Sequence, residues 1–265
     1  MEFKTYRTLS QNVRQQIDRV KKLWHAHLGN DLTGLYLHGS LALGRFVEET
    51  SDLDFLAVCE KRISPEQRLL LAKGMAALQQ SPCPLEMSAI WKSHLIPWNH
   101  PTLCQFHYSG LWDAHYRGLL QGTILESKLI YQDFQDPDIA CHVNLTRQYG
   151  ICLYGQPTAD LLPAVPEHDF WHSLCEGLDT SHFPCSAREQ ANYILTLVRV
   201  YSYQQLRKIL SKYDAAIWAK EHLPRQYGPL LDDAVQVCYN QKSFAALQGQ
   251  CAQELCKQIL KKLQA

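Results

Sequence analysis

Residues 37–54 read LHGSLALGRFVEETSDLD, and the interpretation of this chain depends on them. The apolar residues at 34–38 predict a short strand, which ends at the small pair Gly39 and Ser40. Backbone N–H groups and a hydroxyl at the end of a strand are the hydrogen-bond donors that a phosphate group needs. This turn is therefore a candidate phosphate-binding loop.

Two acids follow in the same stretch. Asp52 and Asp54 lie in an alternating apolar segment, 51–58, which predicts a second strand. Side chains two positions apart on a strand point to the same face, so we expect both carboxylates to lie close together. Such a pair repels itself unless a cation lies between the two groups, and Mg²⁺ is the oxygen-preferring ion that fits. An isolated Asp-x-Asp is common by chance, but its position after a strand and a Gly-Ser turn predicts nucleotide chemistry.

A third acid, Glu86, lies in a predicted strand at 85–91. Taken alone, a glutamate in a strand more often faces solvent than takes part in chemistry. Beside two strands that already carry an Asp pair, it becomes the third carboxylate of the group. It either completes the metal shell or takes the proton from an attacking hydroxyl, and the residues alone leave both roles open.

Hydrophobic patterns divide the chain into two parts. The front part combines the strands with helices predicted at 11–28 and 65–78, the second of them capped by Ser64. From about residue 138 the patterns are helical, over 138–152, 188–210, 213–223, 227–240 and 243–263. Turn and breaker residues predict a boundary near 155. We therefore expect an α+β fold, with a mixed sheet and helices over 1–155 and an all-helical bundle over 156–265.

Composition restricts the partners and the location. The 26 Lys and Arg balance 26 Asp and Glu, and no basic stripe is present, so no nucleic-acid partner is expected. Residues 1–8 lack the apolar segment of a signal peptide, and no apolar run is long enough to predict membrane association. Ten cysteines without a Cys-x-x-Cys pair predict buried free thiols in a reducing compartment. We expect a cytoplasmic monomer.

The Gly39-Ser40 turn followed by Asp52-x-Asp54 resembles the nucleotidyltransferase superfamily, whose members transfer a nucleoside monophosphate from a nucleoside triphosphate. More closely, nearly the whole chain is similar to the aminoglycoside nucleotidyltransferases that adenylylate spectinomycin and streptomycin. The similar stretches are 36–40, 51–54, 85–86, 96–98, 165–169, 192–199 and 218–227. The first two of these are common to the superfamily, and the later ones are specific to this subgroup.

The resemblance implies roles for individual residues. It implies two Mg²⁺ ions on Asp52 and Asp54, with Glu86 as catalytic base or as a further metal ligand. The residues implied in holding ATP, the co-substrate, are Gly39, Ser40, Ser51, Arg199, Lys212 and Tyr239. Those implied in contacting a cationic aminoglycoside or aminocyclitol are Glu86, Trp112 and Glu189, the last at a position where the family usually has Asp.

Ordinary structural explanations exist for some of these residues. A basic residue in a helix, such as Arg199, usually belongs to a solvated face. Its apolar neighbours at 197, 198 and 200 indicate partial burial, however, and a partly buried arginine usually has an anionic partner. Lys212 is distinguished by the resemblance alone, and Trp112 fits a core position as well as a drug pocket.

The acceptor is indicated by one departure from the family pattern. Members that accept streptomycin as well as spectinomycin carry an additional Trp and Asp ahead of the acidic drug contact. Residues 178–185 contain no Trp, and their only acid is Asp179, which resembles the branch specific for spectinomycin. We expect transfer of AMP from Mg·ATP to a spectinomycin hydroxyl. The alternatives are the same chemistry on streptomycin or on another small-molecule or protein acceptor, and a catalytically silent nucleotide-binding module, against which the three carboxylates argue.

Overall fold

The computed structural model describes residues 2–125, 127, 130, 132–178, 183–240, 247 and 249–263. The chain forms two compact units, Phe3–Leu174 and Cys175–Ala265, the latter together with Met1–Glu2. The first unit contains a mixed sheet with helices, and the described part of the second is helical. The expected α+β class is confirmed.

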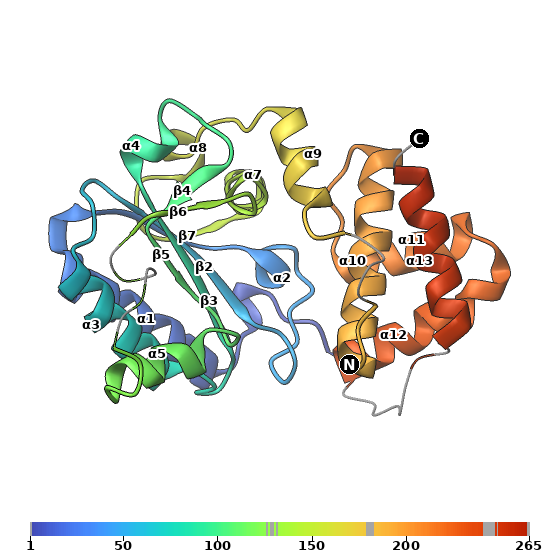
Figure 1. Cartoon of the computed structure of the whole chain (residues 1–265), viewed down its shortest axis with the longest axis horizontal. Coiled ribbons are helices and arrows are strands. Elements are labelled where there is room, and N and C mark those ends of the chain that lie inside the picture. Colours follow the sequence, from blue (N-terminus) through green and yellow to red (C-terminus); the bar gives the residue numbers. More distant parts are fainter. Residues whose placement is uncertain are drawn as a thin grey trace. The chain divides into compact units, whose positions relative to one another are not determined.

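A five-stranded sheet with the order β5-β3-β2-β1-β7 forms the centre of the first unit (Figure 1). Its strands are β1 (Leu32–Leu37), β2 (Leu53–Cys59), β3 (Leu85–Trp91), β5 (Phe106–Tyr108) and β7 (Ile151–Gly155). Only β2 and β3 pair in parallel, and the other neighbours are antiparallel. A parallel pair needs a long crossover, and α3 (Pro65–Leu78) supplies it, beginning where Ser64 Oγ accepts a hydrogen bond from Gln67 N at 3.2 Å.

Alternation along the strands gives each face of the sheet its own hydrophobic core. One face packs against α3 and α1 (Gln11–Leu28), and the other packs against α7 (Ile139–Tyr149) (Figure 1). On β2, Phe55 and Ala57 belong to the first core, whereas Leu56 belongs to the second. Asp54, two positions before Leu56, therefore lies on the α7 face of the sheet.

Shorter elements complete the first unit. They are η1 (Tyr6–Thr8), η2 (Gly29–Asp31), α2 (Gly39–Ala42), α4 (Lys92–Leu95), β4 (Thr102–Cys104), α5 (Asp113–Leu120), β6 (Phe134–Asp136), α8 (Thr158–Leu161) and α9 (Glu167–Cys175). The strands β4 and β6 pair with each other in a second, two-stranded sheet.

The helix expected over 138–152 is wrong at its C-terminal end. The helix α7 ends at Tyr149, and the following residues, Ile151–Gly155, form β7 on the free edge of β1. Gly150 follows the last residue of the helix, at a position where a Cβ would collide with the carbonyl of Thr146. Apolar periodicity does not separate a buried helix end from a short strand, and pairing with β1 decides the outcome.

The first unit also extends about twenty residues beyond the boundary expected near 155. Leu161 and Leu162, at the end of α8, are buried with Tyr36 and Leu56 in the core between the sheet and α7. Trp98 then donates a 2.8 Å hydrogen bond from Nε1 to Asp169 on α9. These long-range contacts attach α8 and α9 to the first unit.

Four longer helices form most of the described part of the second unit, and each overlaps an expected helical segment, although the one expected over 188–210 ends at Leu206. They are α10 (Ala187–Leu206), α11 (Lys212–His222), α12 (Gly228–Asn240) and α13 (Gly249–Leu263), with the 3-10 turn η3 (Arg225–Tyr227) before α12. The start expected for the last helix, residue 243, lies outside the described residues. Helix α10 is central, because it contacts α11, α12 and α13.

The cysteine expectation needs one correction. All ten cysteines are free, but only Cys59, Cys83, Cys104 and Cys256 are buried, while Cys152 and Cys185 are exposed. Cys152 lies on β7 at the edge of the sheet, where its side chain is exposed even though both sequence neighbours are apolar. Among the described residues, no helix is both long and apolar enough to cross a membrane.

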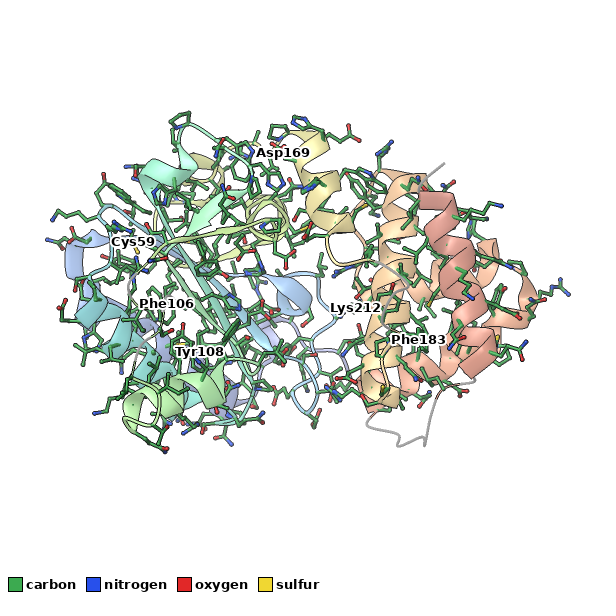
Figure 2. All side chains as sticks on the ribbon, in the orientation of Figure 1. Cys59, Phe106, Tyr108, Asp169, Phe183 and Lys212 are labelled. Carbon is green, nitrogen blue, oxygen red and sulfur yellow. The ribbon has the colours of Figure 1, made fainter. Side chains whose placement is uncertain are left out.

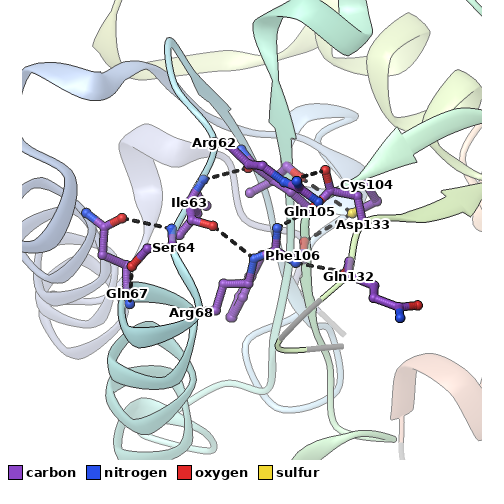
Figure 3. A network of polar contacts seen from close by, with 11 residues as sticks. Arg62, Ile63, Ser64, Gln67, Arg68, Cys104, Gln105, Phe106, Gln132 and Asp133 are labelled. Carbon is purple, nitrogen blue, oxygen red and sulfur yellow. Dashed lines mark hydrogen bonds and ion pairs between the residues drawn. The ribbon is translucent and has the colours of Figure 1, made fainter. Parts of the chain in front are cut away.

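A buried ion pair holds the crossover helix in place (Figure 3). The Arg68 side chain on α3 is 2% exposed and pairs with Asp133, while its Nη1 donates to the Gln132 carbonyl at 2.8 Å. Arg62, half exposed, donates from Nε to the other oxygen of Asp133 at 3.0 Å. Asp133 therefore compensates a buried charge and binds an exposed one.

We expect Asp133→Asn to lower the free energy of unfolding by about 3 kcal/mol, because it leaves the Arg68 guanidinium buried without its counter-charge. The matched control is Arg62→Gln, which removes the exposed partner and should cost less than about 1 kcal/mol. Urea unfolding at constant m-value measures both. Equal losses in the two variants would contradict this account of the pair.

Candidate active site

The Gly-Ser turn lies directly against Asp54. Strand β1 ends at Leu37, and His38 N donates a 3.0 Å hydrogen bond to the carbonyl of Asp54 on β2. Gly39 follows with φ of +62°, a conformation that favours glycine, and a Cβ there would overlap Asp54 Oδ2. Ser40 is half-buried beside it. Only glycine at 39 allows the turn to approach the carboxylate so closely.

Asp54 and Glu86 are brought together by the register of β2 and β3. The two residues are Cα partners in the parallel ladder, so both side chains point to the α7 face from strands about 4.8 Å apart. Both are half-buried. Glu86 forms no hydrogen bond or ion pair with another described residue, which leaves its carboxylate available to a ligand.

Asp52 and Ser51 lie outside the strand that was expected to contain them. Strand β2 begins at Leu53, and Asp52 is exposed in the preceding loop. Its charge, after burial and the charge of Glu48, contributes to raising the pKa of Cys83. The Ser51 hydroxyl accepts a 3.0 Å hydrogen bond from Val47 N, which closes this loop. Ser51 therefore has a local structural task in addition to the phosphate contact implied for it.

The donor set suits Mg²⁺ chemically, because carboxylate oxygens are the ligands that this ion prefers. Asp54 and Glu86 are neighbours, and the backbone at Gly39 packs on Asp54 with no room for a side chain. Within the described ranges, no three His, Cys, Asp or Glu residues are already arranged as a metal site. Asp52, Asp54 and Glu86 thus remain the predicted ligands.

Three histidines to which the sequence assigned no role lie on the α7 side of the sheet or on α7 itself. His38 is buried beside His142 of α7, with 4.9 Å between ring centroids, and burial holds its pKa well below the usual value. A 3.1 Å hydrogen bond joins Nδ1 of His107, on β5, to Ser88 Oγ. Burial also lowers the pKa of His107, against the opposing charge of Glu86. Only His38, directly before the Gly-Ser pair, carried a signal in the sequence.

Trp112 is a surface residue of the first unit. It directly precedes α5, is 40% exposed, and its ring lies 5.8 Å from that of His115. The adjacent Leu111 is 93% exposed. A core role for Trp112 is therefore wrong, and the side chain is accessible to a ligand.

In the second unit, the predicted nucleotide-binding residues occupy neighbouring helices. Arg199 on α10 has a buried Nε that lacks a hydrogen-bond partner among the described residues. Burial raises the pKa of Tyr239 on α12 to about 12, and the charge of Arg199 partly opposes this shift. Lys212, at the start of α11 (Figure 2), donates from Nζ to Asn192 Oδ1 at 3.3 Å. This unit thus presents two cations beside a tyrosine.

Glu189 has a structural task in addition to the drug contact implied for it. It is the third residue of α10 and forms a capping box with Ser186, whose Oγ accepts from Glu189 N at 3.2 Å. The Glu189 carboxylate in turn accepts a 2.7 Å bond from the Ser186 hydroxyl, which lowers the pKa of this exposed acid. The motif Ser-x-x-Glu before an apolar helix was the available signal. Of the stretch used to judge the acceptor, 179–182 lies outside the described residues.

A Gly-Ser turn packed on one of two neighbouring carboxylates, at one face of a mixed sheet, is the arrangement expected of a nucleotidyltransferase. The aminoglycoside adenylyltransferase C-terminal domain family matches residues 160–262. A spectinomycin 9-adenylyltransferase from Staphylococcus aureus is 31% identical over 212 residues, 78% of this chain and 77% of the relative. The chain belongs to the family of aminoglycoside and spectinomycin adenylyltransferases and is an enzyme of the nucleotidyltransferase type.

A further relative and a solved structure are also similar to this chain. An aminoglycoside (3'') (9) adenylyltransferase from Klebsiella pneumoniae is 29% identical over 241 residues, 88% of each chain. The solved structure of a spectinomycin adenyltransferase from Enterococcus faecialis, with ATP and spectinomycin, has a TM-score of 0.80 at 23% identity and covers 95% of this chain and 99% of its own. That likeness shows the common fold.

We expect Gly39→Ala to weaken Mg·ATP binding at least about tenfold, because the new methyl group must displace the Asp54 carboxylate. Gly44→Ala is the matched control: Gly44 has φ of +68° but open space around its Cα. Both variants should lose about 1 kcal/mol of stability from the left-handed backbone. Calorimetric titration with Mg·ATP separates them, and equal affinities would show that close packing on Asp54 has no functional consequence.

Proposed function

We propose that this enzyme transfers AMP from Mg·ATP to a hydroxyl group of spectinomycin. The observation that carries the proposal is the register pair Asp54 and Glu86 beside the Gly39 turn, in a chain of this family. Relatives from Staphylococcus aureus and Campylobacter jejuni are spectinomycin 9-adenylyltransferases, and the solved neighbour was crystallised with ATP and spectinomycin. The absence of Trp from residues 178–185 favours spectinomycin over streptomycin.

Glu86 is the base in this proposal. Its half-buried carboxylate accepts the proton of the acceptor hydroxyl, and the oxygen forms a bond to the α-phosphorus of ATP as the bond from that phosphorus to the bridging oxygen breaks. The products are the adenylylated drug and pyrophosphate. Glu86 forms no hydrogen bond or ion pair with another described residue, so no such bond fixes the orientation of its carboxylate in this structure.

Asp52 and Asp54, with Glu86 as a third candidate, would hold two Mg²⁺ ions. Bound Mg²⁺ supplies positive charge that offsets the negative charge of the triphosphate. Gly39, Ser40 and Ser51 offer hydrogen-bond donors to the phosphates in this proposal.

Arg199, Lys212 and Tyr239 of the second unit also bind the nucleotide in this proposal. The buried, unpartnered Nε of Arg199 supports an anionic partner for this side chain, since a buried donor without one costs about 1–3 kcal/mol. Trp112 and Glu189 contact the cationic drug, and their exposure is compatible with that role. We further propose that the enzyme acts as a cytoplasmic monomer, without nucleic acid or membrane.

The first test is pyrophosphate release from Mg·ATP with spectinomycin, with streptomycin and without acceptor. We expect turnover with spectinomycin alone, and at least about a hundredfold loss in Glu86→Gln because the base is removed. Glu254→Gln, an exposed glutamate on α13, is the control and should match the unaltered enzyme. Turnover with streptomycin would overturn the acceptor assignment. Tight ATP binding without turnover on any acceptor would favour a silent nucleotide-binding module.

The two tasks of Glu189 are separable by substitution. Glu189→Gln keeps an oxygen acceptor for the capping box but removes the charge, so stability should change by less than about 0.5 kcal/mol. Its KM for spectinomycin should rise about tenfold, because a charged contact to the drug is lost. Glu189→Ala should lose the cap as well, at about 1 kcal/mol. An unchanged KM in Glu189→Gln would show that Glu189 is only a helix cap.

A further inference from the structure

Glu86 lies on β3, and the strands on either side, β2 and β5, carry polar side chains on the same face of the sheet. On one side its register partner is Asp54 on β2, and on the other side β5 pairs antiparallel with β3 through Met87–Ala89. In that ladder Ser88 and His107 are direct Cα partners. Because Glu86 and Ser88 share a face, His107 is the diagonal neighbour of Glu86, at about 7 Å between Cβ atoms and within reach of a glutamate.

His107 is held more firmly than a surface histidine. Its Nδ1 lies 3.1 Å from Ser88 Oγ, and Ser88 is only 1% exposed. Its backbone carbonyl accepts a 2.6 Å hydrogen bond from the hydroxyl of Tyr116, a fully buried residue of α5. Both the ring and its backbone therefore have fixed positions.

The Ser88 contact engages Nδ1 of His107 and leaves Nε2 as the second ring nitrogen. When the Ser88 hydroxyl donates to Nδ1, the proton of the neutral ring is on Nε2, which becomes a hydrogen-bond donor. Glu86 is the carboxylate whose charge acts most strongly on His107, and it has no hydrogen bond to another described residue.

We propose that His107 is a positioning residue for Glu86 in the substrate complex: its ring, anchored through Nδ1 to Ser88, then donates Nε2–H to the Glu86 carboxylate, which forms no hydrogen bond to another described residue in this structure, and orients it toward the acceptor hydroxyl. This inference rests on the proposed role of Glu86 as the base. A base must lie within hydrogen-bond reach of the proton that it removes, and a displacement of about 1 Å costs on the order of a hundredfold in rate. Asp54 cannot supply this orientation, because two carboxylates repel each other.

Two amide substitutions separate the roles of the two ring nitrogens of His107. His107→Asn keeps a polar atom at the position of Nδ1, next to Ser88, and removes Nε2. His107→Gln places its amide nearer to the position of Nε2. We expect His107→Asn to lower kcat for pyrophosphate release about thirtyfold with KM for ATP within about twofold of the unaltered enzyme, and His107→Gln to recover kcat to within about fivefold.

The controls separate positioning from folding and from failure of the proposed function. His25→Asn, an exposed histidine on α1, should leave kcat unchanged, and urea unfolding should show similar midpoints for both His107 variants. In a Glu86→Gln background, His107→Asn should cause no further loss, because the group that it orients is gone.

Three outcomes would overturn the inference. Normal turnover in His107→Asn, with Glu86→Gln inactive, would remove the role of His107 and leave the proposed function intact. Equal losses in Asn and Gln variants, in step with lower unfolding midpoints, would assign His107 a structural role only. Additive losses in the double variant would show that His107 acts independently of Glu86. Full turnover in Glu86→Gln would instead refute Glu86 as the base, and no turnover of the unaltered enzyme with spectinomycin would refute the proposed function itself.

Discussion

The parallel pairing of β2 with β3 is the constraint on which the rest of the first unit depends. It is the only parallel pair in a sheet that is otherwise antiparallel, and its register makes Asp54 and Glu86 direct neighbours. Two carboxylates at this separation repel each other, so the arrangement is unfavourable for the empty protein and favourable once a cation is present. The buried Arg68–Asp133 pair and the capping box of α3 hold the crossover that makes this pairing possible.

The residues around Asp54 and Glu86 shape this site through close packing and neutral hydrogen-bonding groups rather than through further charges. The turn at Gly39 packs on Asp54 where no side chain fits, and His38 donates its backbone N–H to the same strand. Burial keeps His38 and His107 below their usual pKa values, so at neutral pH these rings act as neutral hydrogen-bonding groups. Neutral rings leave the local negative charge available to a metal ion.

The helical unit combines stability with ligand chemistry in the same side chains. Glu189 caps α10, and Lys212 begins α11 while its Nζ binds Asn192. Arg199 differs, because its buried Nε has no described partner and therefore contributes a cost that a bound anion would remove. A helix surface can therefore retain residues that are unfavourable for folding when they are useful for binding.

Local patterns in the sequence determined the elements and the chemical class. The helices at 11–28 and 65–78 and the strand at 85–91 have the predicted bounds, because periodicity and capping act between residues close in the chain. The Gly39-Ser40 turn and the three carboxylates were recognisable for the same reason. Tertiary structure alone decided that Asp54 pairs with Glu86, that Asp52 lies before the strand, that 151–155 joins the sheet, and that His107 and His142 line its face. Strand register and edge pairing depend on contacts between residues far apart in the chain, and no local pattern contains them.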